Sequence, residues 1–221
     1  MDNKDLNNME IIFPINPLET IFALQRELMV DYQVIEKWDV DFPVNLNLKK
    51  SQLLVKDVIA RAVEELAEAF EALELGDTAN FLEELADALH FFTEVFILAD
   101  ITVEDYTQFL CSFYGDFSPG DPLITLEKSG YARTRNMGEG LKGLMFDIIY
   151  QVNLSRNALR NKPWKQTELM YNKEVFNSTL MEGYTLFLEL FLWSHPEGEV
   201  GVYETYYKKN QINRFRIKSK Y

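Results

Sequence analysis

The sequence contains little cysteine and no long uncharged apolar run. With a single cysteine, Cys111, no intramolecular disulfide can form, and its apolar neighbours favour a small buried side chain over a reactive thiol. No run of about 18 apolar residues is free of charge, which argues against a membrane-spanning helix, and the first residues lack the basic end and apolar stretch of a signal peptide. We therefore expect a soluble, cytoplasmic protein without a membrane partner.

Positive charge is also scarce over most of the chain. The 35 Asp and Glu residues outnumber the 22 Lys and Arg residues, and the formal net charge of −13 repels nucleic-acid backbones over long range. The exception is the stretch 208–220, which carries six basic side chains and no acidic one. We expect no nucleic-acid partner, and the acidic body with a basic end suggests two halves of one charged site.

Apolar residues at helical spacing are abundant. They make up 47% of the 221 residues, which is enough for a core. Repeats, low-complexity tracts and strand-like alternation are missing, whereas apolar positions recur every three or four residues in seven segments. These segments are 17–37, 51–75, 79–98, 103–113, 141–159, 167–193 and 199–215. The sequence therefore predicts an all-α helical bundle that forms a single domain over residues 1–221.

Turn residues separate these segments. Gly76 ends one helical segment and Asp77 can cap the next, which predicts a tight antiparallel helical hairpin. The stretch 114–140 contains several Gly and Pro residues, among them the sequence Ser-Pro-Gly-Asp-Pro, and predicts a long flexible loop or flap. Loops of that length in a compact domain tend to be functional or mobile.

Two acidic pairs lie on the two arms of this hairpin. Glu65 and Glu68 are three residues apart, as are Glu84 and Asp87, so each pair shares one face of its helix. Antiparallel packing can bring the four carboxylates together, where they raise one another's pKa values unless hard cations neutralise them. Oxygen ligands of this charge suit Mg²⁺, with Mn²⁺ as a substitute. The pattern predicts a metal site on the hairpin.

The acidic residues have two other interpretations. A single acidic run on a helix usually forms a solvated face. Here the acidic pattern occurs on both arms of a tight hairpin, with apolar residues between the acids, which favours a metal site beside the packed face. A di-iron carboxylate bundle needs a Glu-x-x-His pair on each of two helices. This chain has one Asp-x-x-His, from Asp87 to His90, and its other histidine, His195, follows Leu192 by three. That class is excluded, and His90 is either a hydrogen-bonded core residue or part of the site.

The acidic pattern resembles a known family. ExxE followed by ExxD on consecutive helices is similar to the all-α nucleoside triphosphate pyrophosphohydrolases, which include MazG-type enzymes and dimeric dUTPases. The stretch 87–91, Asp-Ala-Leu-His-Phe, looks like the dimeric dUTPase version of the second motif, and 209–216 resembles that branch's K-N-x-x-N-x-F-R signature. MazG-type enzymes generally lack the signature. Leu24 and Gln25 resemble the Leu-Gln of the family's first helix.

This resemblance implies Mg²⁺-dependent hydrolysis of a deoxynucleoside triphosphate, above all dUTP, to the monophosphate and pyrophosphate. It also implies a homodimer with a C-terminal phosphate-binding motif at 206–221, acting in a host's cytoplasm if the chain is phage-encoded. The residues implied are Glu65, Glu68, Glu84 and Asp87 as catalytic metal ligands, with Glu65 as the base; Lys209, Asn210 and Arg216 at the phosphates; and Gln25, Trp38, His90 and Asn213 at the base and sugar.

Two positions depart from the family pattern. Met29 stands where the family often has an asparagine, and Lys220 where it usually has a glycine. Methionine cannot supply the hydrogen bonds that distinguish uracil from cytosine, so a dCTP-preferring enzyme or a broad-range MazG-type enzyme is an alternative. A non-catalytic helical interaction module, whose acidic face and basic tail bind partner proteins, is the alternative outside catalysis, and it has no reason to require Mg²⁺.

Overall fold

The computed structural model describes residues 11–36, 41–114, 120–129 and 140–219. Within these ranges all regular structure is helical and no strand occurs, which confirms the predicted all-α class. The helices are α2 (Pro17–Glu36), α3 (Lys49–Leu75), α4 (Thr78–Leu98), α5 (Val103–Tyr114), α6 (Pro122–Ser129), α8 (Gly140–Ala158), α9 (Lys173–Ser194) and α10 (Gly198–Ser219). None of these helices combines the length and apolarity that a membrane span requires.

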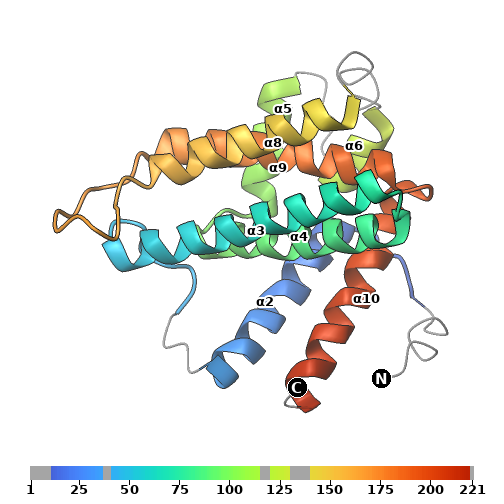
Figure 1. The fold of residues 1–221 in the computed structure, drawn as a ribbon, viewed down its shortest axis with the longest axis horizontal. Helices are drawn as coiled ribbons and strands as arrows, with labels where there is room; N and C mark the ends of the chain where they lie inside the picture. The colour runs from blue at the N-terminus through green and yellow to red at the C-terminus, as the bar shows by residue number, and fades with distance from the viewer. Residues whose placement is uncertain (1–10, 37–40, 115–119, 130–139, 220–221) are drawn as a thin grey trace.

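The helices are arranged in layers around α4. Figure 1 shows α3 and α4 as an antiparallel pair across the middle, α8 and α9 as a second antiparallel pair on one side of it, and α2 and α10 side by side on the other. Helix α4 contacts α2, α3, α9 and α10, and more than half of its residues are buried. Side chains on α4 can therefore meet side chains from both ends of the chain.

The predicted hairpin turn between α3 and α4 is confirmed. Gly76 has a φ of 75°, a left-handed conformation that glycine adopts without strain, and its N–H donates to the carbonyl of Leu73 at 3.2 Å. The Asp77 carboxylate then accepts a hydrogen bond from the N–H of Asn80 at 3.0 Å and caps α4. This turn sets α3 and α4 antiparallel and brings their acidic segments face to face.

The predicted loop at 114–140 contains a helix, so the expectation of a continuous loop is wrong at Pro122–Ser129. Asp121 begins that helix, because one carboxylate oxygen accepts from the N–H of Leu123 at 2.9 Å. Its other carboxylate oxygen accepts from the N–H of Leu18 at 2.8 Å and so joins the starts of α6 and α2. Residues 115–119 and 130–139 of this stretch lie outside the described residues.

The predicted helix at 167–193 is also shorter than expected, because α9 begins at Lys173. In the residues before Lys173, backbone groups form hydrogen bonds with asparagine side chains and not with one another in a helix. The amide of Asn161 accepts from the N–H of Leu169 and donates to its carbonyl, both at 2.8 Å, and the Asn172 side chain caps α9. Asparagine side chains compete in this way with the helical hydrogen bonds of the backbone.

Gln52 on α3 anchors this loop to the bundle. Its buried side chain donates to the carbonyls of Leu46 and Leu169 at 2.9 and 2.8 Å, and accepts from the N–H of Asn161 at 3.0 Å. Gln52→Leu removes the side-chain partner of the Leu46 carbonyl and of the Asn161 N–H, while the Leu169 carbonyl keeps the Asn161 amide as a donor. Each buried group left unpaired costs about 1–3 kcal/mol. We expect the free energy of unfolding in urea to fall by about 3 kcal/mol or more, whereas Gln108→Leu, at an exposed position on α5, leaves it nearly unchanged. Similar losses in both variants would contradict this role.

Candidate metal centre

Three of the four predicted acids converge between α3 and α4. Glu65, Glu84 and Asp87 each offer a carboxylate oxygen, and these three oxygens lie within 4.8 Å of one another. Oxygen ligands on opposite sides of a Mg²⁺ ion are separated by about 4.2 Å, given metal–oxygen distances of about 2.1 Å. The side chains are half-buried. Small rotations of these three carboxylates would therefore suffice to bind one hard divalent cation.

Glu68, the fourth predicted acid, lies outside this group. Its side chain is exposed, and it is not among the three whose oxygens lie within 4.8 Å. Its negative charge nevertheless raises the pKa values of Glu65 and Glu84. The structure therefore places Glu68 at the rim of the centre, where it adds negative charge without meeting the other three carboxylates.

Burial and the charges of the neighbouring acids raise the pKa of Glu65. Burial, followed by the charges of Asp87, Glu68 and Glu84, raises the pKa of Glu65 to about 7. In its protonated form Glu65 donates a hydrogen bond to Glu84. Burial also raises the pKa values of Glu84 and Asp87. The centre therefore holds more negative charge than its surroundings neutralise, and a divalent cation would displace the proton of Glu65.

These raised pKa values predict that the metal-free protein loses stability as the pH rises. A carboxyl with a higher pKa in the folded state binds its proton more tightly when the protein is folded. Its contribution to the free energy of unfolding is therefore complete below the ordinary pKa of 4.5 and is lost as the pH rises past about 7. In EDTA, we expect the free energy of unfolding in urea to fall between about pH 5 and pH 7.5, and Glu65→Gln to flatten that fall.

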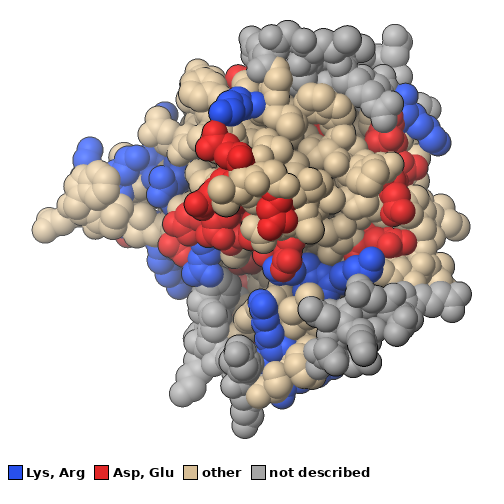
Figure 2. All heavy atoms as spheres, turned by 45° about the vertical axis from the view of Figure 1, so that its right-hand side comes forward, with Lys and Arg blue, Asp and Glu red and all other residues tan. Residues whose placement is uncertain are grey.

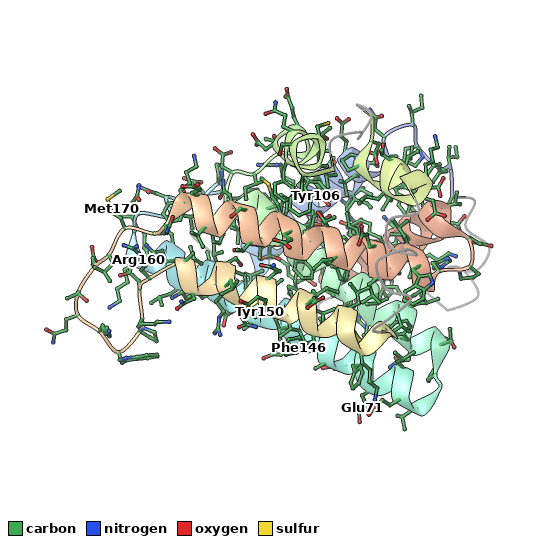
Figure 3. All side chains as sticks on the ribbon, turned by 90° about the horizontal axis from the view of Figure 1, so that it is seen from above. Glu71, Tyr106, Phe146, Tyr150, Arg160 and Met170 are labelled. Atoms are coloured by element: carbon green, nitrogen blue, oxygen red, sulfur yellow. The ribbon has the colours of Figure 1, made fainter. Side chains whose placement is uncertain are left out.

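The matched control for this titration is Glu71→Gln. Glu71 is exposed on the same helix, and Figure 3 shows it pointing away from the bundle. This substitution removes the same charge from a position remote from the centre. The free energy of unfolding of this variant should therefore fall with pH as it does in the wild type. If both variants flatten the fall equally, general charge repulsion explains it and the pKa of Glu65 does not.

Lys209 on α10 provides the centre with a counter-ion. Its ammonium lies 2.6 Å from a carboxylate oxygen of Asp87 and 2.7 Å from one of Glu83. Burial lowers the pKa of Lys209, but the hydrogen bonds to these two acids outweigh burial and the pKa lies above its ordinary value. Lys209 is therefore charged and held beside the centre by its two ion pairs, and its predicted role at the phosphates stays a prediction. Figure 2 shows acidic side chains across the middle of one face, with basic side chains directly beside them.

The other predicted phosphate residues differ in position. Arg216 is exposed, and its charge lowers the pKa of Asp87, so it faces the acidic side. Asn210 is completely buried within the bundle and hydrogen-bonds Tyr206, so the structure does not bring it to the surface of the centre. Glu83, which pairs with Lys209, was not among the predicted residues, although it adjoins Glu84 in the same acidic run.

A cavity of about 240 Å³ adjoins the centre and shares Asp87 with it. Three of the four residues predicted at the base and sugar line this cavity: Gln25, His90 and Asn213. The buried side chain of Met29 also contributes to the lining. The fourth predicted residue, Trp38, lies outside the described residues. The volume is below the range of about 300–1,000 Å³ for drug-sized ligands, so the cavity suits one part of a nucleotide.

Hydrogen bonds fix the polar wall of this cavity. The side-chain oxygen of Gln25 lies 2.6 Å from Nδ1 of His90 and accepts from the Tyr206 hydroxyl at 3.1 Å. The rings of His90 and Tyr206 stack with centroids 4.2 Å apart. Burial lowers the pKa of His90 to about 3, so the ring is neutral and its Nδ1 carries the proton donated to Gln25. His90 is therefore a hydrogen-bonded residue of the cavity wall.

The chain was also compared with known proteins. No protein-family model, curated protein or solved structure matches it. The convergence of Glu65, Glu84 and Asp87, the counter-ion Lys209 and the adjoining polar cavity are thus the structural basis on which a function can be inferred.

Proposed function

We propose that this protein is a Mg²⁺-dependent nucleotide pyrophosphohydrolase that cleaves a deoxynucleoside triphosphate, dUTP above all, to the monophosphate and pyrophosphate. The observation that carries the proposal is the sharing of Asp87 between a group of three carboxylates and a polar cavity. Carboxylates that hold Mg²⁺ beside a cavity for a planar ring are what a nucleoside triphosphate requires, because its phosphates bind the metal while its base needs a shaped pocket.

Each group has a role in this proposal. Bound Mg²⁺ would neutralise phosphate oxygens and lower the pKa of a water molecule. Glu65 would accept the proton of the attacking water, a role that suits a carboxyl with a pKa of about 7. Lys209 and Arg216 would supply positive charge to the phosphates, and Gln25 with His90 would orient the base.

The motif resemblance extends the proposal to fold type and assembly. The acidic pairs and the C-terminal signature fall on α3, α4 and α10, the helices that meet at the centre. This placement supports a bundle of the all-α nucleoside triphosphate pyrophosphohydrolase type. The proposal therefore includes a homodimer, which light scattering coupled to size-exclusion chromatography would test, and a cytoplasmic location.

Met29 favours a second candidate within the same reaction class. Its side chain lines the cavity and offers no hydrogen-bond donor to a base edge. Selection of uracil over cytosine would then depend on the polar side chains of the lining, among them Gln25, His90 and Asn213. A dCTP-preferring enzyme or a broad-range MazG-type enzyme is consequently the alternative, and it differs from the main proposal only in base preference.

The experiment that tests the proposal is pyrophosphate release from dUTP, dCTP, dTTP, dATP and dGTP, in Mg²⁺ and in EDTA. Release from dUTP that EDTA abolishes is the expected result. Release confined to dCTP, or similar with all five, would replace dUTP by the second candidate. No release from any of the five would reject the enzyme and favour the helical interaction module, in which the acidic face binds a partner protein without Mg²⁺.

A further inference from the structure

A second cavity, of about 550 Å³, lies between the first half of α3 and the end of α8. Its lining includes Lys56, Arg156, Lys162 and Trp164. Lys56 and Glu65 are nine residues apart on α3, which corresponds to about two and a half helical turns and about 13 Å along the axis. The two side chains therefore leave α3 on opposite faces, and the lining of this cavity shares no residue with that of the pocket at the acidic centre.

Three cations gather at this cavity. Lys56 is buried and donates to the carbonyl of Asn161, while the guanidinium of Arg156 donates to the Lys56 carbonyl at 3.2 Å. Across the described part of the chain, neither of these residues nor Lys162 forms an ion pair with a carboxylate. In a protein of net charge −13, three basic groups without a paired acid need an explanation.

The electrostatics of Lys56 show that this positive charge is not compensated. Burial, followed by the charges of Lys162 and Arg156, lowers the pKa of Lys56 to about 8. Asp57 is the acid in the lining, and its carboxylate lies 3.2 Å from the guanidinium of Arg61, so it is already engaged. A bound anion would neutralise the three cations and restore the pKa of Lys56.

The fourth lining residue is an aromatic side chain open to solvent. Trp164 is 75% exposed, although burial of an aromatic ring of this size is strongly favourable. It lies on the loop between α8 and α9, which extends past the end of the helices from Arg160 to Met170 (Figure 3). An exposed indole beside three cations offers a stacking face next to an anion site.

We infer that this cavity binds a nucleotide, with its phosphates at Lys56, Arg156 and Lys162 and its base stacked on Trp164. The volume falls within the range of about 300–1,000 Å³ found for small-molecule sites. A small ligand is favoured over a nucleic acid, because the net charge of the whole protein repels a long polyanion. The site goes beyond the proposed function and requires no divalent ion, since the protein itself supplies the positive charge.

The test is isothermal titration of the full chain with ADP, adenosine and inorganic phosphate, all in EDTA. Without a divalent ion the acidic centre repels phosphates, so binding of ADP or phosphate reports on the basic cavity. We expect ADP to bind, and to bind more tightly than adenosine or phosphate. The double variant R156A/K162A should lower the affinity for ADP by about tenfold or more, and Trp164→Ala by about tenfold.

The matched control is the double variant R160A/K165A. It removes two positive charges from the same region at exposed positions outside the cavity lining, so its affinity for ADP should stay near that of the wild type. Equal loss in both double variants would overturn the site, as would the absence of ADP binding or an unchanged affinity in Trp164→Ala. Tighter binding of a ten-nucleotide single-stranded DNA than of ADP would instead identify a nucleic-acid surface and overturn the nucleotide assignment.

Discussion

Asp87→Asn and Glu84→Gln are expected to abolish Mg²⁺-dependent pyrophosphate release, with kcat/KM for dUTP falling by about 10³-fold or more. Asp87 belongs to both the carboxylate group and the adjoining cavity, and Glu84 is one of its two partners in that group. Stabilisation of transition-state charge by a metal ion is worth several kcal/mol, and about 4 kcal/mol corresponds to 10³-fold in rate. The measurement is steady-state release of pyrophosphate at saturating Mg²⁺.

Two control variants and a stability measurement accompany this prediction. Glu71→Gln, at an exposed site on α3, should retain full activity, and Glu68→Gln at the rim should lose less than either main variant. Glu84→Gln removes one of several mutually repelling carboxylates, so the metal-free variant should unfold at no lower urea concentration than the wild type. Activity that survives both main substitutions would reject the metal centre.

Gln25→Leu is expected to lower kcat/KM for the preferred triphosphate by about 10²-fold and to reduce discrimination between bases. The Gln25 oxygen is the common acceptor for Nδ1 of His90 and the hydroxyl of Tyr206. Leucine removes the acceptor of Nδ1 of His90 in a buried wall and offers nothing to a base edge, while the Tyr206 hydroxyl keeps the Ile21 carbonyl as an acceptor. Kinetics with all five deoxynucleoside triphosphates would measure the change as a ratio between bases.

Tyr206→Phe is the graded comparison for this substitution. It removes the hydroxyl that donates to Gln25 but keeps the Gln25 amide and the stacking of ring 206 on His90. Its effect on discrimination between bases should therefore be smaller than that of Gln25→Leu. The ratio between bases separates recognition from folding, because a damaged fold lowers turnover of all five substrates alike. Unchanged discrimination in Gln25→Leu would show that this cavity does not hold the base.

Local sequence patterns were enough to predict most of the helices. Apolar spacing identified the hairpin arms, and Gly76 and Asp77 marked the turn because their conformational and capping preferences act within a few residues. The same local spacing placed Glu65 and Glu84 on helix faces that an antiparallel pair can bring together. Local patterns were insufficient at α6, where Asp121 also binds the N–H of Leu18 far away in the sequence, and at the start of α9, where the Asn161 side chain binds the backbone of Leu169.

The sequence by itself therefore determined the all-α class, the hairpin and the approach of its acids, because each depends on residues close together in the chain. Only the tertiary structure decided that Lys209 pairs with Asp87, that Gln25 meets His90, and that Glu68 lies at the rim. These contacts join α2, α4 and α10, helices that are distant in sequence. Helical periodicity shows which face of a helix is buried, but the packing of several helices determines which side chains meet there.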